Sequence, residues 1–556
     1  MLLDIKKEVR DLNRFRHILL VLFEEGFGYL LDKIKLKRHI PFKNRIKKTK
    51  EEISPAVRLR IILEKLGPTF IKLGQLLSVR PDLIPKEYIK ELEKLQDKVK
   101  AAPFNEIEKE IEKELKKPIK NLFSSFNEKP IASASISQVY EAKLKSGDKV
   151  AVKIQRPNVK NIMKTDIEIM IYIAKLIEKN MPEIRKYNPT KIVEEFADWT
   201  ERELDFRIEA RNAKKFYKNF QGSRTIHIPR VYDEYTTPNI LVTEFIEGIE
   251  LHDIEKIKKN KLDFGKIIKN GFDAILTQVF VHGFFHGDPH PGNILIMKNN
   301  VIGLVDFGIV GYFNEDLKTK SISLLYGIIE DDLDKVADTF LEMGAVGEKD
   351  IDIDRFKFEV RDTIEELQEA KIKDVKVSGV LENVLDIALK YNVRMPTDFV
   401  LFGKTIVTLE GIALEYDPNF KFVESTKPFI EKLMRERLSP KYMMGNIIEN
   451  ASKFKKFISE LPKQTTEALK KIQSGKIKID IEDTDVKKLA LEIDKSSNRL
   501  AYGIIIAALI VAGALVMQVN QPLIFGMPVI SFISFLIAFI LLIMLFSSIL
   551  SERRLR

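Results

Sequence analysis

The chain has 556 residues, of which 45% are hydrophobic and 31% are charged. It is too long for one compact domain and too apolar for a disordered protein, so we expect a globular body with added segments. It contains no cysteine, which excludes disulfides and thiolate metal sites.

Residues 1–50 are predicted to form a basic amphipathic segment. Charged and apolar positions alternate at helical spacing over residues 2–24, which predicts a surface helix that packs on the body or on lipid. Residues 33–50 hold nine basic residues and no acidic one, against a net charge of +10 for the whole chain. Such a run can bind nucleic acid or anionic lipid headgroups, and the apolar C-terminus favours lipid. We therefore expect no nucleic-acid partner, and no signal peptide because Glu24 and Glu25 interrupt the apolar stretch.

Residues 51–125 are predicted to form a helical extension. Pro68 suits the first turn of a helix, and apolar residues three or four positions apart form a stripe along it. Lys72 and Gln75 then lie together on another face. Taken alone, this pattern favours Lys72 as a solvated charge on a helix.

Residues 126–247 are predicted to form a small β-rich lobe. The alternating pattern of residues 149–154 predicts a strand and places Lys153 where a kinase holds the lysine that contacts the α- and β-phosphates. A carboxylate on a following helix should pair with this lysine. The candidates are Glu203, Asp205 and Glu209, and the sequence does not choose among them.

The same lobe should end at a hinge that contacts adenine. Residues 240–248 have the pattern of a strand leading out of the lobe. Backbone groups near Glu244 and Ile246 are therefore predicted to lie beside the base of a bound nucleotide.

Residues 248–440 are predicted to form a helical lobe that carries the reaction chemistry. Phosphoryl transfer needs a carboxylate near the accepting group, an amide oxygen for a metal, and a carboxylate that bridges Mg²⁺ to the phosphates. Asp288, Asn293 and Asp306 fit these roles in that order. The spacing of the first two matches a kinase catalytic loop, and a hairpin of residues 294–296 and 303–305 would bring Asp306 beside them.

Two features of this lobe limit its chemistry. His282, His286 and His290 recur at the spacing of zinc ligands on a helix, but the prolines at 289 and 291, on either side of His290, disfavour a helix there. His286 is therefore predicted to brace the loop. After Gly308 the chain reaches a predicted helix start at residues 314–316, which leaves no room for an activation segment. Peptide phosphorylation is therefore not expected.

The C-terminal part is predicted to be a tether followed by a membrane hairpin. Residues 441–499 form the amphipathic tether. Residues 501–550 contain no charged side chain, and segments 501–519 and 528–550 are long enough for two transmembrane helices. Basic residues at both ends of the predicted 500–550 hairpin place the body in the cytoplasm. The alternative is a buried hairpin in the protein core.

The motifs together resemble the UbiB/ADCK (AarF) family of atypical protein-kinase-like proteins. Its KxGQ motif appears as Lys72, Gly74 and Gln75, its ExD motif as Glu203 and Asp205, and its catalytic loop as residues 286–293. A C-terminal membrane hairpin is also similar to the bacterial branch. The resemblance implies an α+β, two-lobed protein-kinase-like fold with an N-terminal helical extension.

The resemblance also implies site residues and cofactors. An alanine-rich loop replaces the kinase glycine loop, and its Cβ atoms limit the approach of the backbone to phosphates. Lys72 of the KxGQ helix would occupy the active-site mouth and act with Asp288, Lys153 and Glu203. The expected cofactors are ATP or ADP and Mg²⁺. The loop is present here in altered form as Ala132, Ser133, Ala134, Ser135 and Ile136.

The function implied is that of a membrane-anchored ATPase or small-molecule kinase in a prokaryotic cell membrane. It would support isoprenoid-quinone or other membrane-lipid metabolism, with anionic lipid, a prenylated small molecule or lipid-biosynthetic enzymes as partners. Two alternatives stay open: a non-catalytic nucleotide-sensing scaffold for membrane enzymes, and a protein kinase.

Overall fold

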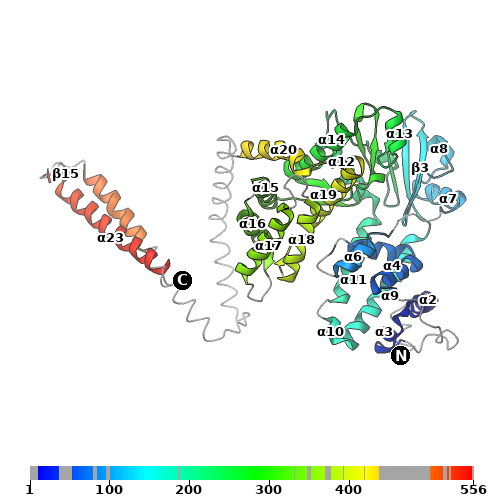
Figure 1. Ribbon diagram of the computed structural model, residues 1–556. Helices are drawn as coiled ribbons and strands as arrows, with labels where there is room; N and C mark the ends of the chain where they lie inside the picture. Colours follow the sequence, from blue (N-terminus) through cyan, green and yellow to red (C-terminus); the bar gives the residue numbers. More distant parts are fainter. Residues whose placement is uncertain are drawn as a thin grey trace. The chain divides into compact units, whose positions relative to one another are not determined.

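The protein is described from a computed structural model that divides into two compact units, Met1–Tyr442 and Met443–Arg556 (Figure 1). Each unit is treated by itself. The predicted tether lies outside the described residues, as does most of the basic run. The structure describes residues 11–36, 53–78, 80, 84–95, 101–185, 188–330, 332–346, 352–369, 377–391, 393–418, 420–437, 501–517, 523–524 and 527–553.

The N-terminal lobe is built on an antiparallel five-stranded sheet of order β1-β3-β4-β6, with β2 paired to β3. Along β4, Val150, Val152 and Ile154 are buried and point to one face, as the alternating pattern predicts. Helices α7 and α8 cover this face, so Lys153 points to the opposite side, toward the cleft. The elements are α7 (Phe104–Leu115), α8 (Ile119–Leu122), β1 (Phe123–Phe126), β2 (Ala132–Ser133), β3 (Ser137–Leu144), β4 (Lys149–Gln155) and β6 (Ile240–Glu244).

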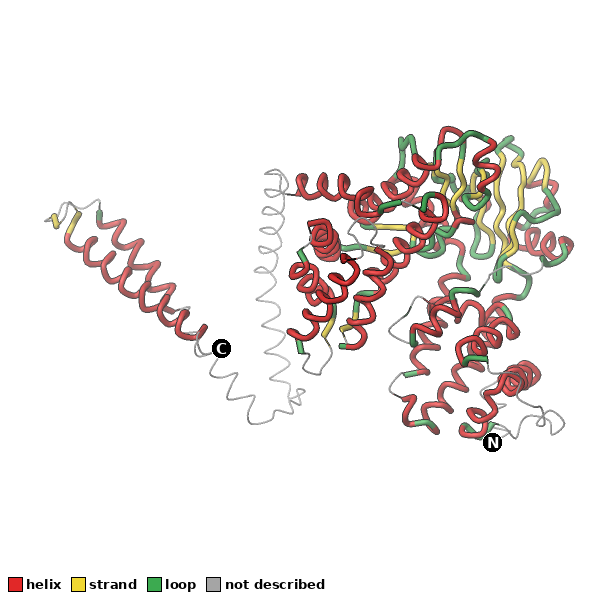
Figure 2. The backbone as a smooth tube through the Cα atoms, in the orientation of Figure 1, coloured by secondary structure: helices red, strands yellow, loops and turns green. Residues whose placement is uncertain are grey.

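A helical group combines the N-terminal extension with residues 159–203, which fall inside the segment predicted as the β-rich lobe. Their apolar side chains form one core, and the strands lie apart from these helices in Figure 2. The elements are α2 (Leu12–Leu22), η1 (Phe23–Phe27), α3 (Gly28–Lys33), α4 (Pro55–Leu66), α5 (Pro68–Ser78), α6 (Lys86–Leu92), α9 (Val159–Asn180), α10 (Pro182–Arg185) and α11 (Pro189–Glu203).

Helix α12 (Phe206–Asn219) connects this group to the C-terminal lobe, because its apolar face belongs to the core of that lobe. The lobe contains a four-stranded sheet of order β5-β10-β9-β7 and the pair β8-β11. These strands are β5 (Ile226–His227), β7 (Ile249–Glu250), β8 (Phe284–His286), β9 (Ile294–Ile296), β10 (Ile302–Leu304) and β11 (Val310–Tyr312).

Helices make up most of the rest of the C-terminal lobe. The described elements are α13 (Ile254–Lys259), α14 (Phe264–Leu276), η5 (Thr277–His282), α15 (Glu315–Glu330), α16 (Leu333–Met343), β12 (Ala345–Val346), α17 (Ile353–Glu369), α18 (Val377–Lys390), β13 (Val393–Arg394), α19 (Thr397–Tyr416) and α20 (Phe422–Arg437). The predicted hairpin before Asp306 is confirmed as β9 and β10, which are antiparallel. The result is the two-lobed α+β fold that the motifs predict.

The described part of the C-terminal unit consists of a helical run over residues 501–516, strands β14 (Leu523–Ile524) and β15 (Met527–Pro528), and α23 (Val529–Arg553). No helix among the described residues is both long and apolar enough to cross a membrane. The predicted transmembrane hairpin is therefore not supported. The first run ends before the predicted residue 519, and its 16 residues extend only about 24 Å.

Candidate active site

Three charged side chains meet between the lobes. Lys153 lies on the central strand β4, and its Nζ contacts the Glu209 carboxylate on α12 at 2.8 and 2.9 Å and Asp306 Oδ2 at 3.1 Å. The sequence left three carboxylates as partners of this lysine, and the structure selects Glu209. The pair ties α12 to the sheet.

Burial and the neighbouring charges together set the protonation of this cluster. Burial disfavours a charged Lys153, but Asp306 and Glu209 outweigh it and raise the pKa of Lys153. Burial also raises the pKa of Glu209, to about 7, although Lys153 opposes the rise. Burial works against ionised Asp306 too, yet Lys153 lowers its pKa to about 2, with a smaller effect from Lys72. Asp306 is therefore the carboxylate that stays ionised near neutral pH.

The backbone at Asp306 has φ of 60°, in the left-handed region that aspartate tolerates better than bulkier residues. Its Oδ1 accepts a hydrogen bond from Gly308 N at 3.2 Å. The next residue, Phe307, packs on Phe216 of α12 with ring centroids 5.0 Å apart, and its carbonyl accepts from Asn212 Nδ2 at 2.9 Å. Helix α12 thus fixes both the lysine partner and the segment that carries Asp306.

His286 braces the catalytic loop, as predicted. Its Nδ1 accepts from Asp288 N at 3.1 Å, so its other ring nitrogen carries the proton and donates to Val305 O at 3.1 Å. Asn293 Nδ2 donates to Asp288 O at 3.0 Å, which directs its Oδ1 away from this bond. The loop that holds Asp288 and Asn293 is thereby joined to the segment before Asp306.

The donor set fits a hard cation such as Mg²⁺, because it pairs the ionised Asp306 carboxylate with the Asn293 amide oxygen. The Asp306 side chain is 46% exposed, so it can reach a ligand in the cleft. The three histidines that resemble a zinc motif make separate local contacts. His282 packs edge-on against Phe220, and His290 Nδ1 accepts from Gly292 N at 3.2 Å. Within the described ranges, no group of three or more His, Asp or Glu side chains could hold a metal.

Lys72 is buried rather than solvated. Its Nζ lies 2.5 Å from Glu203 Oε1 and 5.7 Å from the centre of the Trp199 ring. Both charged side chains are at most 16% exposed, so the interpretation of Lys72 as a surface charge is wrong. Helix α5 comes this close to its neighbours because Gly74 has no side chain: a Cβ there would lie 2.3 Å from a methyl group of Leu95.

Comparison with known proteins identifies the family of this fold and site. The chain matches the ABC1 atypical kinase-like domain over residues 94–340, the UbiB helical domain over 360–421 and the ABC1/UbiB kinase-like C-terminal domain over 484–551. It is 32% identical over 538 residues to an uncharacterized protein in the hydrogenase 1 5' region of Clostridium pasteurianum, covering 97% of this chain and 98% of that protein. The chain belongs to the UbiB family of atypical kinase-like proteins.

Other family members carry the name probable protein kinase UbiB. The protein from Pseudomonas paraeruginosa is 34% identical over 424 residues, which is 76% of this chain and 79% of its own length. The protein from Aliivibrio fischeri is 33% identical over 473 residues, or 83% and 86% of the two chains. A solved structure, the complex of Rv3197 with erythromycin from Mycobacterium tuberculosis, covers 65% of this chain and 94% of its own at 23% identity. Its TM-score is 0.41, a likeness too distant to carry a conclusion.

The two acidic residues of the ExD motif occupy different positions in this UbiB-family protein. Glu203 faces Lys72, whereas Asp205 caps the start of α12 and accepts from Arg207 N at 3.1 Å. Arg207 also holds the Asp205 carboxylate through its guanidinium and lowers the pKa of that carboxyl group. Asp205 therefore positions the helix that carries Glu209.

The hinge strand lies where it was predicted. The Glu244 carboxylate accepts from Arg230 N at 3.2 Å and interacts with His227 Nε2 at 2.9 Å. Ile246 is buried and packs closely on Gly303 of β10. The Glu244 carboxylate is therefore held by His227 and Arg230, and the contact of this backbone with adenine stays a prediction.

Sequence reasoning missed Arg156, which fixes the alanine- and serine-rich loop. Its Nε donates to Ala134 O at 2.8 Å and its Nη2 donates to Ser133 Oγ at 2.7 Å. The loop also folds on itself, because Ala134 N donates to Ser137 O at 2.9 Å. Arg156 follows the β4 strand by one residue, but nothing in its local pattern distinguishes it from a surface arginine.

Proposed function

We propose that this UbiB-family protein is a Mg²⁺- and ATP-dependent ATPase or small-molecule kinase that supports isoprenoid-quinone or other membrane-lipid metabolism. The observation that carries the proposal is the cluster of Lys153, Glu209 and Asp306. The backbone carbonyl of Asn293 accepts a hydrogen bond from the N–H of Val305, the residue before Asp306, at 3.0 Å. Bound Mg-ATP would supply the phosphoryl group and the cation. The protein would hold it through residues that already converge.

In this mechanism, Lys153 neutralises phosphate charge while Glu209 holds its ammonium group in place. Asp306 and Asn293 would hold the Mg²⁺ ion through their side-chain oxygens. Asp288 accepts the proton of the attacking hydroxyl group or water, because its backbone is fixed by His286 and Asn293 at the mouth of the cleft. Such electrostatic and positional effects are the main contributions of a protein to phosphoryl transfer.

Two observations favour a small acceptor over a polypeptide. The chain passes from Gly308 through β11, which pairs with β8, directly into α15 at Glu315. The stretch between Gly308 and Glu315 therefore contains no activation segment, the part of a protein kinase that holds a peptide substrate. Lys72 of α5 is also close enough for its charge to contribute to the lowered pKa of Asp306.

Asp306→Asn tests the proposal in the full-length protein. We expect Mg²⁺-dependent phosphate release to fall at least about 100-fold, because the main metal ligand loses its charge. Asp316→Asn is the matched control, since Asp316 forms only an exposed pair with Lys320 on α15. Circular dichroism checks that both variants fold. Unchanged Mg²⁺-dependent turnover in Asp306→Asn would overturn the assignment.

Labelled-ATP transfer separates the two alternative functions. A protein kinase would label casein-like substrates efficiently, whereas we expect no such labelling. A nucleotide-sensing scaffold would bind Mg-ATP with no turnover in any lipid condition. Slow hydrolysis that rises with anionic lipid or a prenylated phenol would support the proposed function.

We also propose that the C-terminal unit binds lipid. Many of its apolar side chains are exposed, including Ile504, Leu515 and Phe539 at 62%, 67% and 59%. This exposure disfavours the alternative of a buried core hairpin, since large apolar patches mark interaction surfaces. At high salt, which screens the basic run of residues 33–50, a chain ending before Leu500 should lose flotation with anionic liposomes and keep Mg-ATP binding. Flotation equal to that of the full chain would contradict this role.

A further inference from the structure

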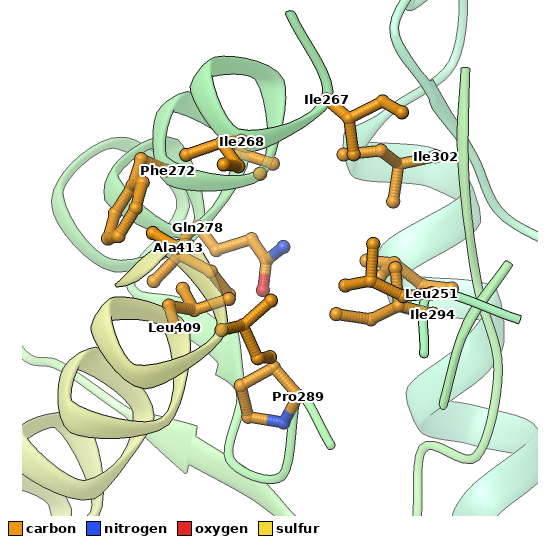
Figure 3. A pocket seen from close by; sticks show the side chains of 15 residues that line it. Leu251, Ile267, Ile268, Phe272, Gln278, Pro289, Ile294, Ile302, Leu409 and Ala413 are labelled. Atoms are coloured by element: carbon orange, nitrogen blue, oxygen red, sulfur yellow. The ribbon is translucent and has the colours of Figure 1, made fainter. Parts of the chain in front are cut away.

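A cavity of about 40 Å³ lies in the C-terminal lobe directly behind the catalytic loop. Helices α14 and α19 form one wall and the strands β9 and β10 form another, as Figure 3 shows. Pro289, which follows Asp288, closes the side toward the catalytic loop. Apolar lining residues include Leu251, Ile267, Phe272, Ile294, Leu409 and Ala413.

One polar side chain, Gln278 of η5, reaches into this apolar space (Figure 3). It is completely buried, and its Oε1 accepts a hydrogen bond from His286 N at 2.9 Å. That bond fixes the orientation of the amide, because the reversed amide would set its NH₂ group against the His286 N–H. The Gln278 Nε2 donor has no partner in the described part of the chain. Buried donors without partners are rare and call for an explanation.

The composition of the wall decides which kind of molecule fits. The space exceeds the roughly 10–15 Å³ that one water needs, but a buried water also needs two to four polar partners. It is well below the roughly 150 Å³ of a cavity that holds benzene, so only a molecule of about three heavy atoms fits. Gln278 is the one polar side chain among the residues that line the cavity in the described structure. A charged ligand is excluded, because no counter-charge lies in the wall.

We propose that this cavity binds a small uncharged molecule with an apolar body and a single hydrogen-bond acceptor, such as a ketone or ether oxygen. The acceptor meets Gln278 Nε2, and the apolar body contacts the surrounding aliphatic side chains. The binding does not depend on the proposed ATPase activity.

Occupancy would be transmitted to the catalytic loop through two short connections. Gln278 holds the backbone of His286 through its Oε1, and the His286 ring accepts from Asp288 N at 3.1 Å. Pro289 contacts the cavity itself. A bound molecule therefore acts on the backbone that carries Asp288 without entering the nucleotide cleft.

The test uses full-length protein and two probes of three heavy atoms, dimethyl ether and propane, which differ by the acceptor. Gly271→Ala fills the cavity: its new methyl group would lie 3.7 Å from Ile302 Cδ1, an ordinary contact that leaves Gln278 untouched. Gly411→Ala is the matched control on α19, because Gly411 is exposed and a Cβ there meets nothing within 4 Å. Gln278→Met removes the donor at similar volume, together with the Oε1 acceptor of the His286 N–H. Ligand-observed NMR measures binding, and circular dichroism checks folding.

We expect dimethyl ether to bind the parent chain and Gly411→Ala equally, in the millimolar range. Gly271→Ala should weaken this binding at least about tenfold, and Gln278→Met about fivefold, which is the usual effect of one neutral hydrogen bond. Propane should bind more weakly than dimethyl ether to the parent chain. Absence of dimethyl ether binding, equal binding of the two probes, or binding unchanged by Gly271→Ala would each overturn the proposal.

Discussion

Asp166→Asn should destabilise the helical group strongly, because this buried carboxylate joins three helices. Arg14 of α2 donates to it at 2.7 Å from Nε and 2.9 Å from Nη2, and Thr69 of α5 donates at 2.7 Å. Asparagine keeps the shape but removes the charge, so the Arg14 guanidinium, in a side chain only 23% exposed, loses its counter-ion. Removing one partner of a buried ion pair costs about 3–5 kcal/mol.

Urea denaturation can measure this effect in the helical group itself. The chain has one tryptophan, Trp199 on α11, which packs on the same apolar core and reports its unfolding by fluorescence. With a denaturant slope of about 2–3 kcal/mol/M, the midpoint should fall by at least about 1 M.

Glu183→Gln is the matched control for Asp166→Asn. It makes the same chemical change in the ion pair between Glu183 and Lys33, whose charged atoms lie 3.0 Å apart. The Lys33 side chain is 34% exposed and the Glu183 side chain is 61% exposed. An exposed pair contributes at most about 1 kcal/mol, so its midpoint should move by less than about 0.5 M. Equal shifts in the two variants would refute the reasoning, because burial would then not distinguish the pairs.

Glu209→Gln should flatten the pH dependence of thermal stability. Burial raises the pKa of Glu209 from 4.5 to about 7, so the stability linked to its protonation is complete below pH 4.5 and is lost as pH rises through 7. The loss is of the order of 3 kcal/mol, and parallel wild-type and variant pH profiles would contradict it. The positive charge of Lys72 lowers the pKa of Asp306 and would oppose a cation bound there. Lys72→Met removes this charge, so Mg²⁺ affinity in a nucleotide-binding titration should rise about two- to fivefold. Weaker Mg²⁺ binding would argue against this. Arg156→Met should weaken fluorescent-nucleotide binding about tenfold with little change in melting temperature, and unaltered affinity would show that the loop does not need it.

The sequence predicted the parts of the site that depend on short spacing. Asp288, Asn293 and the hairpin before Asp306 lie within about twenty residues, so local chain geometry nearly determines their arrangement. The strand position of Lys153 was also readable, because burial alternates along β4 as the apolar pattern does.

Longer-range features were not readable from the sequence. Glu203, Asp205 and Glu209 all follow Lys153 by about fifty residues, and only the packing of α12 shows which one reaches it. The role of Arg156 depends on a tertiary contact, because the loop that carries Ala134 folds back onto its side chain. The membrane-span prediction rested on the length and the lack of charge of the apolar segments, and no described helix meets both requirements for crossing a membrane.

The distant polar cluster and the active site are connected through one helix. Thr69 and Lys72 lie three residues apart on α5, so one turn joins the buried bond to Asp166 and the pair with Glu203. The Thr69 bond fixes the helix that holds Lys72 beside Glu203. The Asp166→Asn substitution should therefore weaken the Lys72–Glu203 pair, although it changes neither of these two residues. The two substitutions Asp166→Asn and Lys72→Met should then be non-additive in Mg²⁺ affinity, because both release the same charge from Asp306.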